Sequence, residues 1–182
     1  LLPFLGLAVA ALAVRAIGLT TGFELWVDEM VYAELGASVA RGELPNLPDG
    51  PFFLHPPGFF VIEGLVIRIF GLGGSDVDLV YALRWVSAVA GSLTVGVVFL
   101  LVRRSSGRVA AVAAAAVLVF EPFVLRNNSR VFLETTAVLP VLVGLLLAGV
   151  GMEIDEVGAP RRRLLTLAAA GVAMGAGILT KD

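Results

Sequence analysis

The chain alternates between long apolar runs and short polar segments, a pattern that predicts helices crossing a membrane. A helix needs roughly 20 apolar residues to cross the ~30 Å hydrocarbon core of a bilayer. A shorter run, Phe59–Gly71, contains Glu63 and Arg68, and as a helix it would reach only about 20 Å. We therefore expect it to lie in the interface rather than to span the bilayer. The runs of spanning length are Leu1–Leu19, Tyr81–Val102, Val109–Leu125, Phe132–Gly151 and Leu164–Thr180.

Composition supports an all-α, polytopic membrane protein. Hydrophobic residues make up 58% of the 182 residues and charged residues only 15%, against about 25% charged in soluble domains. The mean hydropathy of +0.96 leaves too little polar surface for a water-exposed globule. A net charge of −2 excludes a nucleic-acid binder, which needs a basic surface. Because the chain has no Cys, disulfides and thiolate metal sites are excluded as well.

The arginines predict how the spans are oriented. Residues 103–108 and 152–163 carry three Arg each. Because two spans separate these segments, they lie on one side, which the positive-inside rule makes cytoplasmic. The predicted topology has a cytoplasmic N-terminus, five spans in the cell membrane and one large external loop, Thr20–Val80, carrying one or two juxtamembrane helices. We treat residues 1–182 as a single transmembrane domain. Because the chain starts without Met and stops directly after an apolar run, we expect it to be part of a longer protein.

Candidate chemistry concentrates in the external loop, which holds nine acidic residues against two Arg. The pair Asp28-Glu29 is predicted to begin a helix that ends near Arg41-Gly42, with Asp28 as its N-cap. Adjacent carboxylates near an apolar layer raise each other's pKa, and one can then act as a base. Asp28 and Tyr32 are four residues apart and share a face of that helix. From spacing alone, a capping role and a catalytic role both remain open.

Two further features could contribute to a site. His55, the only His in the chain, stands in Leu54-His55-Pro56-Pro57, where the prolines fix the backbone. Its imidazole could bind a phosphate or a metal, or could simply lie in a surface loop before a helix.

Ionisable residues beside or inside the apolar runs are the other feature. Intramembrane charges are costly and are functional candidates by default. Snorkelling to lipid headgroups is the alternative that suits Arg15 best, and a pair with Arg130 at i,i+4 is the alternative for Glu134. In the predicted topology, cations at the outer span ends would suit a phosphate. The charged residues considered are Arg15, Arg84, Arg126, Arg130, Glu134 and Lys181.

The order of these motifs resembles the GT-C glycosyltransferases, most closely the protein O-mannosyltransferase and lipid A aminoarabinose transferase type. The resemblance covers essentially the whole chain, although each motif is short. It implies that the chain is the N-terminal part of such an enzyme. The matching segments are Trp26-x-Asp28-Glu29-x-x-Tyr32, Gly42-x-x-Pro45, His55-Pro56-Pro57, Leu83-Arg84-Trp85, Asn128-Ser129-Arg130 with Glu134, and Leu179-Thr180-Lys181.

The resemblance implies a membrane glycosyltransferase that moves a sugar from a polyprenyl-phosphate donor to a lipid, glycan or protein acceptor on the external face. It implies Asp28 as the catalytic carboxylate and Glu29 as its neighbour. Arg84 and Glu134 match recurrent positions of the family, and Tyr32 and His55 belong to matching motifs. Cations at the outer face, Arg84, Arg130 and Lys181, are expected to contact the donor phosphate. Some relatives have an acidic metal ligand where this chain has Leu54, so no metal or cofactor is assigned.

A secondary transporter or channel is the rival function, with the same charges lining an ion path. Transporters place their sites near the bilayer midplane, often in repeated halves. Here the charges gather at one face and no repeat is present, which favours the enzyme. A non-catalytic subunit of a membrane assembly is the third reading.

Overall fold

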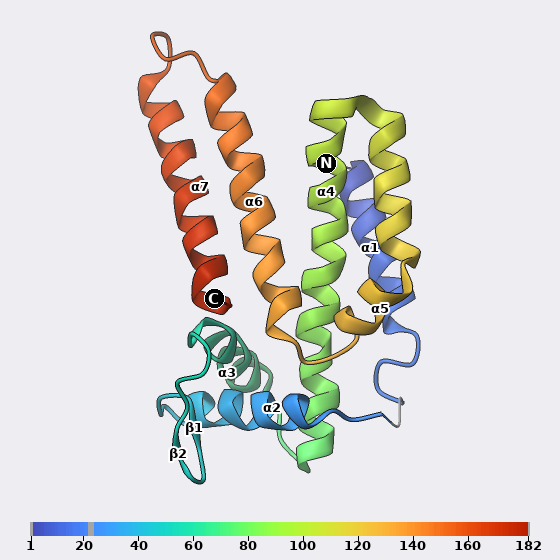
Figure 1. The fold of residues 1–182 in the computed structure, drawn as a ribbon, viewed down its shortest axis with the longest axis vertical. Helices are drawn as coiled ribbons and strands as arrows, with labels where there is room; N and C mark the ends of the chain where they lie inside the picture. The colour runs from blue at the N-terminus through green and yellow to red at the C-terminus, as the bar shows by residue number, and fades with distance from the viewer. Residues whose placement is uncertain (1, 22–23, 182) are drawn as a thin grey trace.

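The computed structural model of the chain describes residues 2–21 and 24–181. Figure 1 shows long, roughly parallel helices standing over two helices that lie across their ends. The helices are α1 (Leu2–Ala16), α2 (Val27–Ala40), α3 (Gly58–Phe70), α4 (Asp76–Phe120), α5 (Pro122–Asn128), α6 (Leu133–Glu153) and α7 (Pro160–Thr180). The strands β1 (Asn46–Leu47) and β2 (Gly50–Pro51) pair antiparallel as a small hairpin.

The all-α membrane class is confirmed. In the described part of the chain, α4, α6 and α7 are long and apolar enough to cross a membrane. The 45-residue α4 folds back on itself at Gly107 (φ 83°, ψ 178°), a backbone conformation that glycine adopts readily. Its two halves contain most of the runs predicted as spans over Tyr81–Val102 and Val109–Leu125.

Two predicted span boundaries were wrong. The helix predicted over Leu1–Leu19 ends at Ala16, before Gly18 turns the chain with a left-handed φ of 72°. The described part of α1 has 15 residues and belongs to the shorter apolar helices. The run predicted to continue to Leu125 ends at Phe120, because Pro122 lacks an N–H and starts the separate helix α5.

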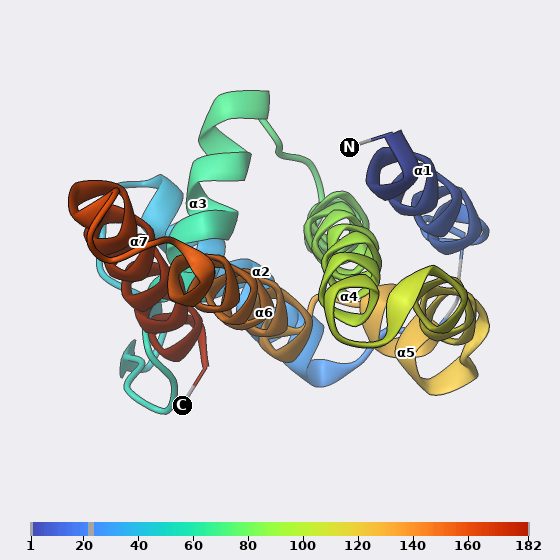
Figure 2. The ribbon, with the colours of Figure 1, turned by 90° about the horizontal axis from the view of Figure 1, so that it is seen from above.

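The two Arg-rich segments lie at the same end of the long helices, as the predicted topology requires. One is the bend of α4 and the other is the loop between α6 and α7, and both lie at the top of Figure 1. At the opposite end, α2 and α3 lie transverse to the long helices in both ribbon views (Figures 1 and 2). The helix α3 has the 13 residues and the transverse course expected of an interfacial helix.

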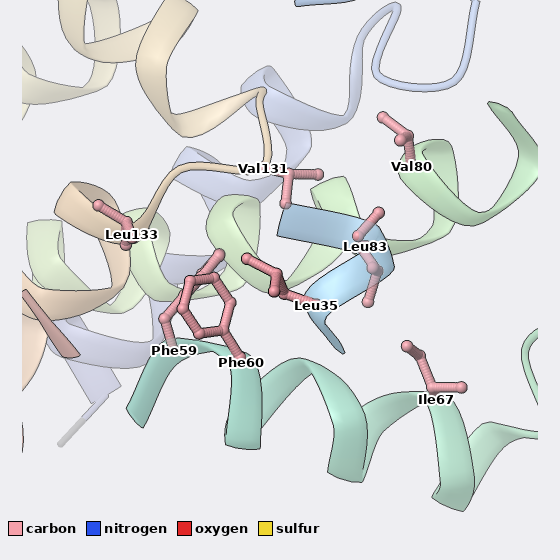
Figure 3. Packing of buried hydrophobic residues seen from close by; sticks show 9 residues of the cluster. Leu35, Phe59, Phe60, Ile67, Val80, Leu83, Val131 and Leu133 are labelled. Carbon is pink, nitrogen blue, oxygen red and sulfur yellow. The ribbon is translucent and has the colours of Figure 1, made fainter. Parts of the chain in front are cut away.

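The main apolar core fastens the transverse helices to the ends of α4 and α6. Figure 3 shows Phe59, Phe60 and Ile67 of α3 meeting Leu35 of α2 and residues from α4 and α6. The start of α3 also packs directly under the end of α7, because a Cβ added at Gly58 would overlap the carbonyl of Leu179. Residues 24–80, the described part of the predicted external loop beyond its first two residues, therefore form a layer held against the ends of the long helices.

Candidate functional site

Glu29 is fully buried and is surrounded by hydrogen-bond donors. Arg84 Nε donates to Glu29 Oε1 at 2.8 Å and Arg84 Nη2 donates to Oε2 at 2.9 Å. Arg130 Nη1 donates to Oε2 at 3.1 Å. The backbone N–H groups of Val131 and Trp26 complete the shell, at 3.1 and 3.2 Å. We call Glu29, Arg84 and Arg130 the Glu29 clamp.

The Glu29 clamp joins three parts of the chain that are distant in sequence. Glu29 stands in the first turn of α2, Arg84 in the first half of α4, and Arg130 between α5 and α6. Arg84 and Arg130 also donate to the backbone carbonyl of Glu24, at 2.9 and 3.0 Å, which fixes the segment entering α2. A bidentate guanidinium–carboxylate pair sets orientation as well as distance. The clamp therefore determines where the start of α2 lies relative to the long helices.

The charge on Glu29 is stabilised despite its burial. Burial alone would raise the pKa of Glu29, but hydrogen bonds from Arg84, Val131 and Trp26 outweigh it and hold that pKa below its usual value. The glutamate is thus an anion at neutral pH, and its side-chain oxygens are occupied. This arrangement is typical of a group that orients its neighbours, because each oxygen already accepts hydrogen bonds from them.

The first turn of α2 also differs from the predicted capping. The N-cap is Trp26, and the Glu29 side chain accepts the Trp26 N–H, so the expectation of Asp28 as N-cap was wrong. Asp28 is the second residue of the helix, and its side chain is exposed. The two adjacent carboxylates therefore have opposite surroundings, one enclosed by arginines and one open to solvent.

A second group of predicted residues surrounds Tyr32, which lies one helical turn after Asp28 in α2. Burial, followed by the charges of Asp28, Glu134 and Glu63, raises the pKa of Tyr32 to about 12. The ring of His55 lies edge-on to the Tyr32 ring, with centroids 6.2 Å apart. The ring of His55, from the loop before α3, thus lies against Tyr32 of α2, and the charge of Glu134, at the start of α6, acts on the same tyrosine. We call Asp28, Tyr32, His55, Glu134 and Lys181 the Tyr32 cluster.

Glu134 forms an ion pair with Lys181, and not with Arg130 as the sequence spacing suggested. Its Oε1 lies 3.3 Å from Lys181 Nζ, which follows the last turn of α7, whereas Arg130 pairs with Glu24 and Glu29. The interpretation of Glu134 as an i,i+4 partner of Arg130 was wrong, because Arg130 precedes α6 and turns toward the Glu29 clamp. Glu134 and Lys181 are partly exposed and form the rim of the Tyr32 cluster.

The eight predicted site residues therefore separate into the buried Glu29 clamp and the more open Tyr32 cluster. Glu24 was not singled out from sequence, yet it pairs with both Arg126 and Arg130. The sequence feature that could have pointed to Glu24 is the spacing of Arg126 and Arg130, which are four residues apart and lie on the same predicted side of the membrane as the acidic loop. Across residues 2–21 and 24–181, no group of three or more His, Asp and Glu side chains is placed to hold a metal ion.

Comparison with known proteins identifies a family for the larger part of the chain. A family model described as dolichyl-phosphate-mannose-protein mannosyltransferase matches residues 54–182. That range begins just before His55 and includes Arg84, Arg130, Glu134 and Lys181. No curated protein and no solved structure matches the chain at a significant level. The matched range covers well over half of the chain, and its apolar helices suit a membrane glycosyltransferase. The chain thus belongs to the dolichyl-phosphate-mannose-protein mannosyltransferase family.

Proposed function

We propose that this chain carries the catalytic carboxylate of a membrane enzyme that transfers a sugar from a polyprenyl-phosphate donor to an acceptor hydroxyl on the external face. The observation that carries the proposal is the contrast between neighbours in α2. Glu29 is buried and saturated with donors, while Asp28 is exposed beside Tyr32. A carboxylate held at a fixed place, with open oxygens, is suited to accept a proton from a bound hydroxyl.

The transfer requires one bond to form and one to break. The acceptor oxygen attacks the anomeric carbon, its proton passes to Asp28, and the bond from that carbon to the donor phosphate oxygen breaks. The departing lipid phosphate takes up negative charge, which a nearby cation stabilises. Lys181 suits this task, because its ammonium is partly exposed at the rim and is held by Glu134. Tyr32 and His55 offer ring faces and polar atoms against which a sugar can bind.

The geometry favours a positioning role for Arg84 and Arg130 over direct contact with the donor phosphate. Both side chains are almost fully buried, and their nitrogens donate to Glu29 and to the Glu24 carbonyl. Withdrawing them for a ligand would leave Glu29 as a buried, unpaired charge. In the proposed enzyme these arginines hold the start of α2, and thereby Asp28, in place for the reaction.

Substituting Asp28 by Asn in the full-length protein tests the proposal. Asparagine keeps the shape of the side chain but accepts no proton, so the rate of sugar transfer should fall by on the order of 10²–10⁴. Stability should change by only about 0.3–1 kcal/mol, the usual contribution of an acid in the first turn of a helix. The measurement is transfer from a polyprenyl-phosphate sugar, alongside thermal unfolding.

Asp49→Asn is the matched control, because Asp49 is an exposed acid of the same loop outside the Tyr32 cluster. Near-normal turnover of Asp28→Asn, with normal folding, would show that Asp28 is not the base. A similar loss of activity in both variants would assign the effect to the charge of the loop rather than to Asp28.

A further inference from the structure

Arg15, near the end of α1, is a buried cation without an acidic partner. Only 1% of the residue is exposed, and no carboxylate of the described part of the chain forms an ion pair with it. Snorkelling to lipid headgroups was therefore the wrong expectation, because the side chain points into the protein. The other buried arginines, Arg84 and Arg130, are each neutralised by Glu29 or Glu24. Among the buried arginines of residues 2–21 and 24–181, Arg15 is the one whose positive charge has no acidic partner, and such a buried charge is costly.

The groups that accept hydrogen bonds from Arg15 are all uncharged, and one of its five N–H groups is left without an acceptor in the described part of the chain. Nη1 donates to the Ala11 carbonyl at 3.2 Å, and Nη2 donates to the Leu118 carbonyl at 3.2 Å. With the Asn128 amide oriented to satisfy both of its neighbours, its oxygen accepts from Arg15 Nε at 3.0 Å and from Nη2 at 2.9 Å. A guanidinium has five N–H groups. The second N–H of Nη1 has no acceptor among residues 2–21 and 24–181.

A cavity of about 200 Å³ with Arg15 among its lining residues lies between α1, both halves of α4, α5 and α6. At ~30 Å³ for each water-sized group, it has room for a phosphate and its substituents but not for a whole lipid. Its lining combines apolar side chains with polar ones, and the uncharged polar residues and the cation among them are Arg15, Thr94, Asn127, Asn128 and Thr135. Glu134 also lines it, but that carboxylate is already paired with Lys181 at 3.3 Å.

We propose that this cavity binds the phosphate group of an anionic membrane phospholipid, with Arg15 as its cationic contact and the acyl chains lying along the apolar helices. Arg15 is one residue from the end of α1, the depth at which lipid phosphates lie when α1 is embedded from that end. Asp28, Tyr32 and His55 are not among the lining residues. The cavity therefore meets the Tyr32 cluster only at Glu134 and is not lined by Asp28, the proposed catalytic carboxylate, which favours a resident phospholipid over the sugar donor.

The bound lipid would connect helices that also support the Glu29 clamp. Asn128 accepts from Arg15, donates to Thr135 Oγ1 at 3.2 Å in the same orientation, and fills the space above Gly91 of α4. Arg130 of the clamp follows two residues later. A phosphate beside Arg15 would neutralise the guanidinium charge at the point where α1, α4, α5 and α6 are joined by these hydrogen bonds.

Native mass spectrometry of the full-length protein, exchanged into nanodiscs of phosphatidylglycerol or of phosphatidylcholine, tests the proposal. The wild type should retain phosphatidylglycerol through detergent washing and should retain phosphatidylcholine less. Arg15→Gln should weaken retention about tenfold or more, as the loss of a charge-assisted hydrogen bond implies. Val138→Trp, which fills the cavity and leaves Arg15 in place, should have the same effect. Arg103→Gln, on the exposed bend of α4, is the control and should retain lipid as the wild type does.

Equal retention by the wild type and Val138→Trp would overturn the proposal, also in the case that Arg15→Gln fails to fold. Equal retention of the two phospholipids would overturn the role of charge. Recovery of a polyprenyl phosphate that Val138→Trp no longer holds would overturn the choice of lipid and make the cavity part of the donor site. Because no sugar transfer is measured, failure here is separate from failure of the proposed function.

Discussion

Replacing Glu29 by Gln should destabilise the protein far more than replacing an exposed acid, because the Glu29 clamp is a buried charge network. Glu29 is fully buried, and the side chains of Arg84 and Arg130 are 4% and 8% exposed. Glutamine keeps the volume but leaves Arg84 without its anionic partner and Arg130 with Glu24 alone. Removing one partner of such a pair typically costs about 3–5 kcal/mol. We expect Glu29→Gln to lie in that range.

The assay is thermal or denaturant unfolding of the purified full-length protein, with Glu34→Gln as the control. Glu34 is an acid of the same helix whose pair with Arg41, at 3.3 Å, is about half exposed. An exposed pair contributes only about 0–1 kcal/mol. If Glu29→Gln were no more destabilising than Glu34→Gln, the clamp would not determine the position of α2, and the positioning role of Arg84 and Arg130 would be refuted.

The sign of the pH dependence gives the same network a second test. Because the pKa of Glu29 is lowered in the folded protein, its contribution to stability is present above the unfolded pKa of about 4.3 and is lost as the pH falls through the lower folded value. Unfolding measured between pH 6 and pH 3 should show this acid-sensitive contribution in the wild type and lack it in Glu29→Gln. A pH profile identical in the two proteins would contradict the assignment.

The remaining predictions concern α3 and the topology. Glu63 of α3 is fully buried with no hydrogen-bond partner among the residues that the structure describes, and burial raises its pKa well above the usual value. The protonated form of Glu63 is therefore favoured in the folded protein. The free energy of unfolding should fall as the pH rises above the unfolded pKa of Glu63, by up to about 1.4 kcal/mol per pH unit. Glu63→Gln should remove this pH dependence in unfolding measurements. Gly58→Ala would force α3 away from the end of α7 and should cost about 1–3 kcal/mol in unfolding, whereas Gly73→Ala, with open space around it, should cost under about 1 kcal/mol. Because the chain has no Cys, Asp49→Cys should react with a membrane-impermeant thiol reagent in intact cells and Ser106→Cys only after permeabilisation, and the reverse pattern would invert the predicted topology.

The sequence by itself determined the class of the molecule and predicted where its chemistry is to be sought. Long apolar runs can satisfy their backbone groups in a membrane only as helices, so the run lengths predicted the all-α membrane fold. The short run with Glu63 and Arg68 predicted a helix too short to span, and α3 has that length and course. The motifs around Asp28 and His55 indicated the glycosyltransferase type, and the family match over residues 54–182 agrees with it.

Only the tertiary structure decided how the charged residues divide their roles. Asp28 and Glu29 are adjacent in sequence and equal in chemistry, but helical geometry turns one toward solvent and the other toward Arg84, 55 positions further along the chain. The partners of Glu134 and Arg15 were misjudged for the same reason, since sequence spacing reports only neighbours within one helix. Pairings between helices depend on where α6 meets α7 and where α1 meets α5, and those meeting points are set by packing across the whole bundle, which no single segment of sequence encodes.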